Sequence, residues 1–156
     1  MARISAAEME KKQKLYDELI LKIFLAEGWD AVTYDRISKD MGVTKSSIQR
    51  YFPSKMHFAT ALQGKIFPEA IRLIDVSSKE RFFESWERSL RENQIFRESL
   101  RIIMTNAIAP VTAQATQNAI TRIAHLLAPT IGEEEAKAAV ELALGRTLLL
   151  YINNEI

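Results

Sequence analysis

The feature that most constrains the fold is one glycine with apolar residues at short, fixed distances on both sides. Gly42 is preceded by Ile37 and Met41 and followed by Val43 and Ile48. These positions suit two short helices that cross steeply and share one small core. Glycine permits the left-handed backbone that a tight turn between such helices requires. The segment is therefore predicted to form a helix-turn-helix.

The fold class predicted for the whole chain is all-α. Its 156 residues include only five glycines and four prolines, and hardly any alternating β-branched stretch. Ser5 and Glu8 form a capping-box pattern before a helix that ends at Glu27. Thr33 and Thr44 are the expected caps of the next two helices, the second of which runs to about Tyr51. Later helices are expected from Pro53–Ser54, with disturbances at Gly64 and Pro68, and over about 78–92, 95–109, 114–128 and 133–152.

Composition excludes several classes of site. The chain has no cysteine, which excludes disulfides, thiolate nucleophiles and Cys-based metal sites. His57 and His125 are far apart in the sequence, so we expect no metal and no cofactor. No signal-peptide pattern precedes the first helix, and the longest uncharged run, residues 102–121, is too polar for a membrane span. The default expectation is a cytoplasmic protein without a membrane partner.

Basic residues are segregated along the chain. The net charge is +1, yet residues 41–68 contain four basic residues and no acidic one. The other 128 residues carry 17 basic and 20 acidic side chains. A basic surface around a helix-turn-helix favours phosphate binding. The alternative is a solvent-exposed helical hairpin that lacks acidic residues by chance.

Helical geometry assigns roles within the expected second helix of this motif. Ile48 points into the module, whereas Lys45, Ser46, Gln49 and Arg50 cover the solvent-facing side. That side would enter the DNA major groove, where Lys45 or Arg50 can donate to guanine and Gln49 can pair with adenine. Two further residues, Thr33 and Lys55, lie at helix starts that favour phosphate.

The segment from Ala31 to Lys55, AVTYDRISKDMGVTKSSIQRYFPSK, resembles the DNA-binding domain of TetR-family transcriptional regulators. The similarity covers roughly residues 12–64. The order of the expected helices divides the chain into two domains, over 1–52 and 53–156. The resemblance implies that the first is a helix-turn-helix DNA-binding domain and the second a helical dimerisation and effector-binding domain. The resemblance implies DNA contacts from Thr33, Thr44, Lys45, Ser46, Ser47, Gln49, Arg50, Tyr51 and Lys55.

The chain departs from the family pattern at several positions. Gln49 stands where the family usually has a tyrosine that packs against the phosphate backbone. Ser46 replaces a common glycine, and Met56–His57 replaces a usual acidic pair. These changes leave the expected fold intact and alter the DNA sequence that the surface would recognise.

The last expected helix carries an apolar stripe. Small and large apolar residues recur at intervals of four and three, which suits close packing against another helix. The stripe consists of Ala138, Leu142, Gly145, Leu149 and Ile152. We predict a homodimer interface here, because paired subunits suit paired DNA half-sites. A central core helix of the monomer is the alternative.

A small hydrophobic effector would need a pocket in the second domain. The residues considered to line it are Phe82, Trp86, Phe96, Met104, Asn106, Ile108 and His125. Aromatic and methionine side chains at helical spacing also occur in ordinary cores, which is the competing interpretation.

Two functions remain open from the sequence. The first is a dimeric repressor that binds a palindromic operator and is released by a small effector. The second is a helix-turn-helix DNA-binding protein controlled by a protein partner. An enzyme is not expected, because no nucleophile–base pair or phosphate-binding glycine loop is present in the sequence.

Overall fold

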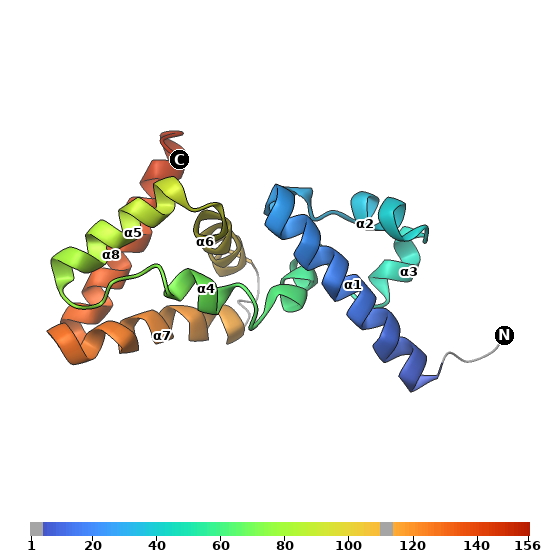
Figure 1. The fold of residues 1–156 in the computed structure, drawn as a ribbon, viewed down its shortest axis with the longest axis horizontal. Coiled ribbons are helices and arrows are strands. Elements are labelled where there is room, and N and C mark those ends of the chain that lie inside the picture. The colour runs from blue at the N-terminus through green and yellow to red at the C-terminus, as the bar shows by residue number, and fades with distance from the viewer. Residues whose placement is uncertain (1–4, 110–113) are drawn as a thin grey trace. The chain divides into compact units, whose positions relative to one another are not determined.

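The computed structural model describes residues 5–109 and 114–156, and every regular element in these ranges is a helix (Figure 1). The prediction of an all-α fold is confirmed. In chain order the elements are α1 (Ala6–Glu27), the 3₁₀ helix η1 (Trp29–Ala31), α2 (Tyr34–Met41), α3 (Lys45–Gln49), the 3₁₀ helix η2 (Lys55–Leu62), α4 (Phe67–Ile71), α5 (Lys79–Glu92), α6 (Gln94–Ala107), α7 (Gln114–Ile131) and α8 (Glu133–Ile152).

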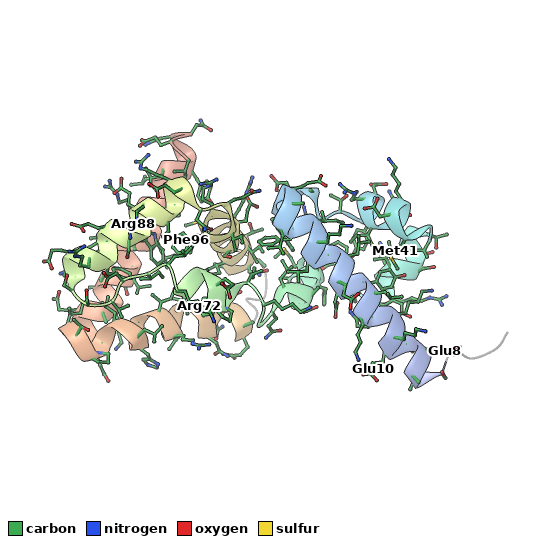
Figure 2. The ribbon with its side chains drawn as sticks, in the orientation of Figure 1. Glu8, Glu10, Met41, Arg72, Arg88 and Phe96 are labelled. Carbon is green, nitrogen blue, oxygen red and sulfur yellow. The ribbon has the colours of Figure 1, made fainter. Side chains whose placement is uncertain are left out.

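The two ends of α1 are formed as the sequence predicts. The Glu8 carboxylate accepts a hydrogen bond from Ser5 N at 2.8 Å, and Glu8 N donates to Ser5 Oγ at 3.2 Å. Hydrogen bonds to the Glu8 carboxylate from the Ser5 backbone N–H, which contributes most, and from the Ser5 hydroxyl hold the pKa of Glu8 below its usual value. Gly28 ends the helix with a φ of 86° and donates its N–H to Phe24 O. Figure 2 shows Glu8 at the start of this helix.

The chain divides into two compact units, and the first extends to Gly64. The sequence placed the boundary after residue 52, but the segment that follows packs into the first unit. Phe58 is fully buried, and its ring centre lies 5.1 Å from that of Phe52 and 4.8 Å from that of Tyr34. Because these aromatic side chains share one core, η2 completes the first unit instead of opening the second.

The fourth predicted helix forms as two short pieces. The first piece is η2, and Ser54 N before it donates to His57 Nδ1 at 3.2 Å. Gly64 then adopts a φ of 73°. Pro68 lies in the first turn of α4, where its missing N–H removes no intrahelical hydrogen bond. Pro68 therefore begins a new helix and does not kink a continuous one.

The core of the second unit is built around Trp86. The Trp86 ring centre lies 5.5 Å from that of Phe82 and 5.3 Å from that of Phe96. Its Nε1 donates to Thr147 Oγ1 at 2.9 Å, and that hydroxyl donates to the Ala143 carbonyl at 2.7 Å. The polar atoms of this apolar core are thus paired, which ties α5 to α8. Figure 1 shows α8 following α7 directly and leaving it at a steep angle.

Tyr16 has a buried hydroxyl group that lacks a partner. The side chain lies on α1 with no exposed surface, and its ring packs against Tyr51 at 5.1 Å. Its Oη makes no hydrogen bond within the described residues. Burial, with a smaller contribution from the neighbouring Tyr51, raises the pKa of Tyr16. By contrast, Tyr34 Oη donates to the carbonyl of Phe52.

These two tyrosines make a matched pair for a stability test. We expect Tyr16→Phe to raise the free energy of unfolding by up to about 1 kcal/mol, because an unsatisfied buried hydroxyl is lost. Tyr34→Phe should lower it by about 1 kcal/mol, because a satisfied hydrogen bond is lost. Urea unfolding followed by circular dichroism measures both. An equal loss in the two variants would show that the Tyr16 hydroxyl is satisfied.

Candidate nucleic-acid interface

The turn between α2 and α3 depends on Gly42. Its φ of 64° and ψ of 36° are left-handed, and its N–H donates to Ser38 O. The Ser38 hydroxyl donates to the carbonyl of Val43, which fixes the next residue of the turn. Thr44 then begins α3 by accepting a hydrogen bond from Ser47 N at 3.3 Å. The predicted turn and helix cap are therefore present. Figure 2 shows Met41 at the end of α2, beside this turn.

The buried residue of α3 determines which of its side chains face solvent. Ile48 and Ile37 have no exposed surface, so one side of α3 packs into the first unit. α3 ends at Gln49, earlier than predicted, and Tyr51 N donates to Ile48 O in the turn that follows. The predicted contact residues that are exposed are Thr44, Lys45, Ser46, Gln49 and Arg50. These five residues, together with Lys55 described below, are called the reading surface here.

Several of the predicted contact residues, inside and outside the reading surface, make contacts within the first unit. Thr44 Oγ1 lies 3.0 Å from Ser46 Oγ and 2.9 Å from Ser47 Oγ. Thr33 Oγ1 caps α2 by accepting a hydrogen bond from Arg36 N at 3.1 Å. Tyr51 is half-buried against Tyr16. The hydroxyl groups of Thr33 and Thr44 therefore stabilise the starts of α2 and α3.

Lys55 is placed by an aromatic ring. Its Nζ lies 5.6 Å from the centre of the Trp29 ring, and Trp29 is only 3% exposed. A cation over an indole face is attracted by the ring electrons. Lys55 is half-buried at the start of η2, so its charge is held near one position. The sequence did not indicate this contact, because Trp29 and Lys55 are far apart along the chain.

An acidic residue lies beside the reading surface. Asp35, in the first turn of α2, accepts an ion pair from Lys45 with an Nζ–Oδ1 distance of 2.6 Å. Residues 41–68 lack acids in sequence, but the fold brings one from the preceding helix to the start of α3. The surface is therefore not free of acidic side chains, although residues 41–68 are. In the sequence, the one feature that could have indicated this contact is the position of Asp35 at the start of the helix that precedes the turn.

Arg36 serves a different purpose from the cations of the reading surface. It pairs with Glu27 at 2.8 Å and with Asp40 at 2.7 Å, which joins the end of α1 to α2. The hydrogen bond from Arg36 is the main cause of a lowered pKa at Glu27. The same two partners, Glu27 first, raise the pKa of Arg36. Arg36 therefore stabilises the arrangement of helices that carries the reading surface.

Two segments of the chain match described protein families. Residues 18–62 match the bacterial regulatory proteins of the tetR family. Residues 63–150, more than half of the chain, match the tetracycline repressor LuxT C-terminal domain. The chain belongs to the TetR family. The junction of the two matches lies close to the division that the structure places at Gly64.

Two curated relatives are similar to this TetR-family chain over a shorter stretch. It is 34% identical over 71 residues to the nucleoid occlusion factor SlmA of Glaesserella parasuis. It is 31% identical over 71 residues to the nucleoid occlusion factor SlmA of Haemophilus ducreyi. Each match covers 46% of this chain and 35% of the relative, so the similarity spans about a third of those proteins.

The predicted dimer residues of this TetR-family chain lie on one exposed side of α8. Leu142 is 61% exposed, Leu149 58% and Ile152 63%, while Ala138 and Gly145 are also exposed. The opposite side of α8 packs into the core of the second unit through Ala136, Ala139, Val140, Ala143 and Leu150. α8 is therefore not wholly enclosed by its own chain, as the core-helix alternative required.

The residues considered for an effector pocket do not surround one cavity. Phe82, Trp86 and Phe96 are buried in the core, where they pack against one another, and Figure 2 shows Phe96 within the second unit. Ile108 is 87% exposed and His125 is exposed, so neither points into that core. The remaining two differ in burial: Met104 is half-buried and Asn106 buried.

The second unit has a small apolar cavity elsewhere. Its volume is about 10 Å³, room for about one water molecule. Phe96 is the only one of the seven considered residues among those that line it, which are Phe67, Ala70, Ile71, Ile74, Phe96, Ser99, Leu100, Ile103 and Ile123. This volume is far below the several hundred Å³ of ordinary ligand pockets.

The described part of the chain contains neither a metal-binding cluster nor a membrane-spanning helix. No group of three His, Asp or Glu side chains in residues 5–109 and 114–156 is arranged to hold a metal ion. Among the helices of those same ranges, none has both the length and the hydropathy needed to cross a membrane.

The left-handed turn at Gly42 gives a prediction for stability. A Cβ at this position would meet no atom within 4 Å, so the cost of a side chain comes from the backbone conformation alone. We expect Gly42→Ala to lower the free energy of unfolding by about 1–2 kcal/mol. Gly42→Asn should cost less, because asparagine tolerates the left-handed region better. Equal stability of Gly42→Ala and the wild type, in urea unfolding, would contradict this account of the turn.

Proposed function

We propose that this chain is a transcriptional repressor that binds a palindromic DNA operator as a homodimer. The observation that carries the proposal is the exposure of Lys45 and Gln49 on α3 and of Arg50 at its C-terminal end, while Ile48 between them is buried. A short helix with basic and amide side chains on its free side fits the width of the major groove. Membership of the TetR family supports the same function.

Each exposed residue of α3 has chemistry suited to a base or a phosphate. Arg50 can donate two hydrogen bonds to guanine O6 and N7 or to phosphate oxygens. Gln49 can both donate and accept, which matches the adenine edge. Lys55, held over Trp29, supplies a positive charge at the start of η2. A DNA phosphate bound there would add a backbone contact to the base contacts of α3. Such a protein would act in the bacterial cytoplasm, where the DNA lies.

The exposed apolar side of α8 supports the homodimer. Contact between water and large aliphatic side chains is unfavourable by roughly 25 cal/mol per Å² of apolar surface. Four exposed side chains of this kind lie along α8, namely Leu142, Leu148, Leu149 and Ile152. Gly145 adds a second argument. A Cβ there would meet nothing within 4 Å, so the fold of one chain does not require glycine, although glycine costs a helix about 1 kcal/mol relative to alanine. Close approach of a second chain would explain it.

Control by a protein partner is the second candidate. It is favoured by the volume of the apolar cavity of the second unit, about 10 Å³, which leaves no room there for a small hydrophobic effector. An effector could bind at this cavity only if the core around Phe96 opened. A protein partner would instead act on exposed surface and leave that core closed.

Charge reversal on α3 tests DNA binding. We expect Arg50→Glu to weaken binding of a duplex selected from random DNA by about 1–3 kcal/mol, or roughly five- to 150-fold. The slope of log affinity against log salt should fall in magnitude by about 1, since one phosphate contact is lost. Fluorescence anisotropy at several salt concentrations measures both quantities.

The matched control for this test is Arg88→Glu, which reverses an exposed charge on α5 of the second unit. It should leave affinity and salt slope close to those of the wild type, and circular dichroism should show equal helicity in both variants. If Arg50→Glu bound DNA as tightly as the wild type, the DNA contact would have to lie elsewhere than at α3.

A charge on α8 tests the homodimer. We expect Leu149→Glu to weaken dimerisation by about 3 kcal/mol or more, because an unpaired carboxylate would be buried in an apolar interface. That loss is about a hundredfold or more in the dimer dissociation constant. Sedimentation equilibrium should detect a monomer at concentrations where the wild type is a dimer.

Leu15→Glu is the matched control, because Leu15 is also exposed, at 47%, but lies on α1 of the first unit. This variant should dimerise like the wild type. A Leu149→Glu variant that remains a dimer of unchanged affinity would place the interface elsewhere.

A further inference from the structure

The ion pair between Asp35 and Lys45 joins the two helices of the helix-turn-helix across its turn. Lys45 is the first residue of α3, and Asp35 is in the first turn of α2. The Nζ–Oδ1 distance is 2.6 Å, with 55% of the Lys45 side chain and 79% of the Asp35 side chain exposed. Both groups therefore lie at the surface that the proposed function brings against DNA.

This carboxylate has two effects on a nearby duplex. It occupies Lys45, whose ammonium would otherwise be free to neutralise a phosphate, and it adds a negative charge that phosphates repel. Affinity for DNA of any sequence depends mainly on how many phosphates are neutralised. Asp35 therefore lowers the sequence-independent part of binding. An ion pair this exposed is weak, so it reduces binding without preventing it.

A base contact is affected differently. An ammonium group has three N–H donors, and the bond to Asp35 uses one of them. The other two remain available for acceptors such as guanine O6 and N7, and the pair with Asp35 limits the directions in which they point. A correct base at this position therefore keeps its contact while Asp35 stays paired. Specificity is the difference between the affinity for cognate DNA and the affinity for non-cognate DNA. Lowering the affinity for non-cognate DNA therefore increases specificity.

We propose that Asp35 is a specificity-determining residue of the reading surface, which holds Lys45 for base contact and suppresses its binding to phosphate on non-cognate DNA. This inference rests on the proposed function. It differs from that function in assigning a role to a residue outside the predicted contact set, and an acidic one.

The test uses the full-length chain and two duplexes of equal length and composition, one selected by the wild type from random DNA and one scrambled. Asp35→Asn should bind the scrambled duplex about three- to fivefold more tightly than the wild type, with a salt slope steeper by about 0.9. Its affinity for the selected duplex should rise less or fall, so the ratio of the two affinities should decrease. Asp35→Glu, which keeps the charge, should largely retain the wild-type ratio.

Two controls isolate the contact from net charge. Glu18→Gln removes one negative charge from an exposed position on α1 of the same unit and should leave the ratio unchanged. In a Lys45→Ala background, Asp35→Asn should have a much smaller effect, because the carboxylate then has no lysine to hold. Circular dichroism should show equal helicity in all variants.

The outcomes separate the inference from the proposed function. An unchanged ratio in Asp35→Asn, or an equal rise in affinity for both duplexes, overturns the inference alone. An effect of Glu18→Gln as large as that of Asp35→Asn also overturns it, because net charge would then be the cause. A wild-type chain that binds neither duplex overturns the proposed function, and the inference with it.

Discussion

The burial of Ile48 is the constraint on which the reading surface depends. α3 has only five residues, and a helix of that length is unstable alone in water. It persists because Ile48 is buried in the core of the first unit and because Thr44 caps its start. The same burial fixes the rotation of α3 about its axis. Lys45, Gln49 and Arg50 are exposed as a direct consequence.

The basic side chains of the first unit have two roles: some stabilise the packing of its helices, and others present their charge to solvent. Arg36 is engaged by Glu27 and Asp40 and joins helices to one another. Lys55 is positioned by the face of Trp29, which leaves its charge uncompensated by a carboxylate in that contact. An aromatic ring can therefore place a lysine without reducing the charge that it offers to a phosphate.

Features set by neighbouring residues were predictable from the sequence, and features set by distant ones were not. The capping box at Ser5, the caps at Thr33 and Thr44 and the turn at Gly42 each depend on groups within a few positions, so their patterns are visible in the sequence. The contacts made by Phe58 depend on the packing of η2, which no local pattern reveals. This is why the boundary was predicted after residue 52, whereas the first unit extends to Gly64.

The candidate site shows the same limit. The exposed side of α3 follows from helical periodicity and the burial of one residue, and the stripe on α8 follows from the same reasoning. The pocket residues were chosen by type, and aromatic side chains at helical spacing are as suitable for a core as for a cavity. Trp86 illustrates the outcome, because its ring and its Nε1 are both occupied by the core.

The position of α8 connects the two proposals about assembly and DNA binding. One side of this helix, through Ala139, Ala143 and Leu150, closes the core of the second unit, so the helix cannot rotate to bury its other side within the same chain. Leu149 and its exposed neighbours therefore cannot leave water by joining the core of the second unit. A second copy of the same chain presents the identical stripe, and a two-fold axis through it makes each copy cover the other. Two reading surfaces related by that axis would recognise a palindrome, because the operator must then have the symmetry of the dimer.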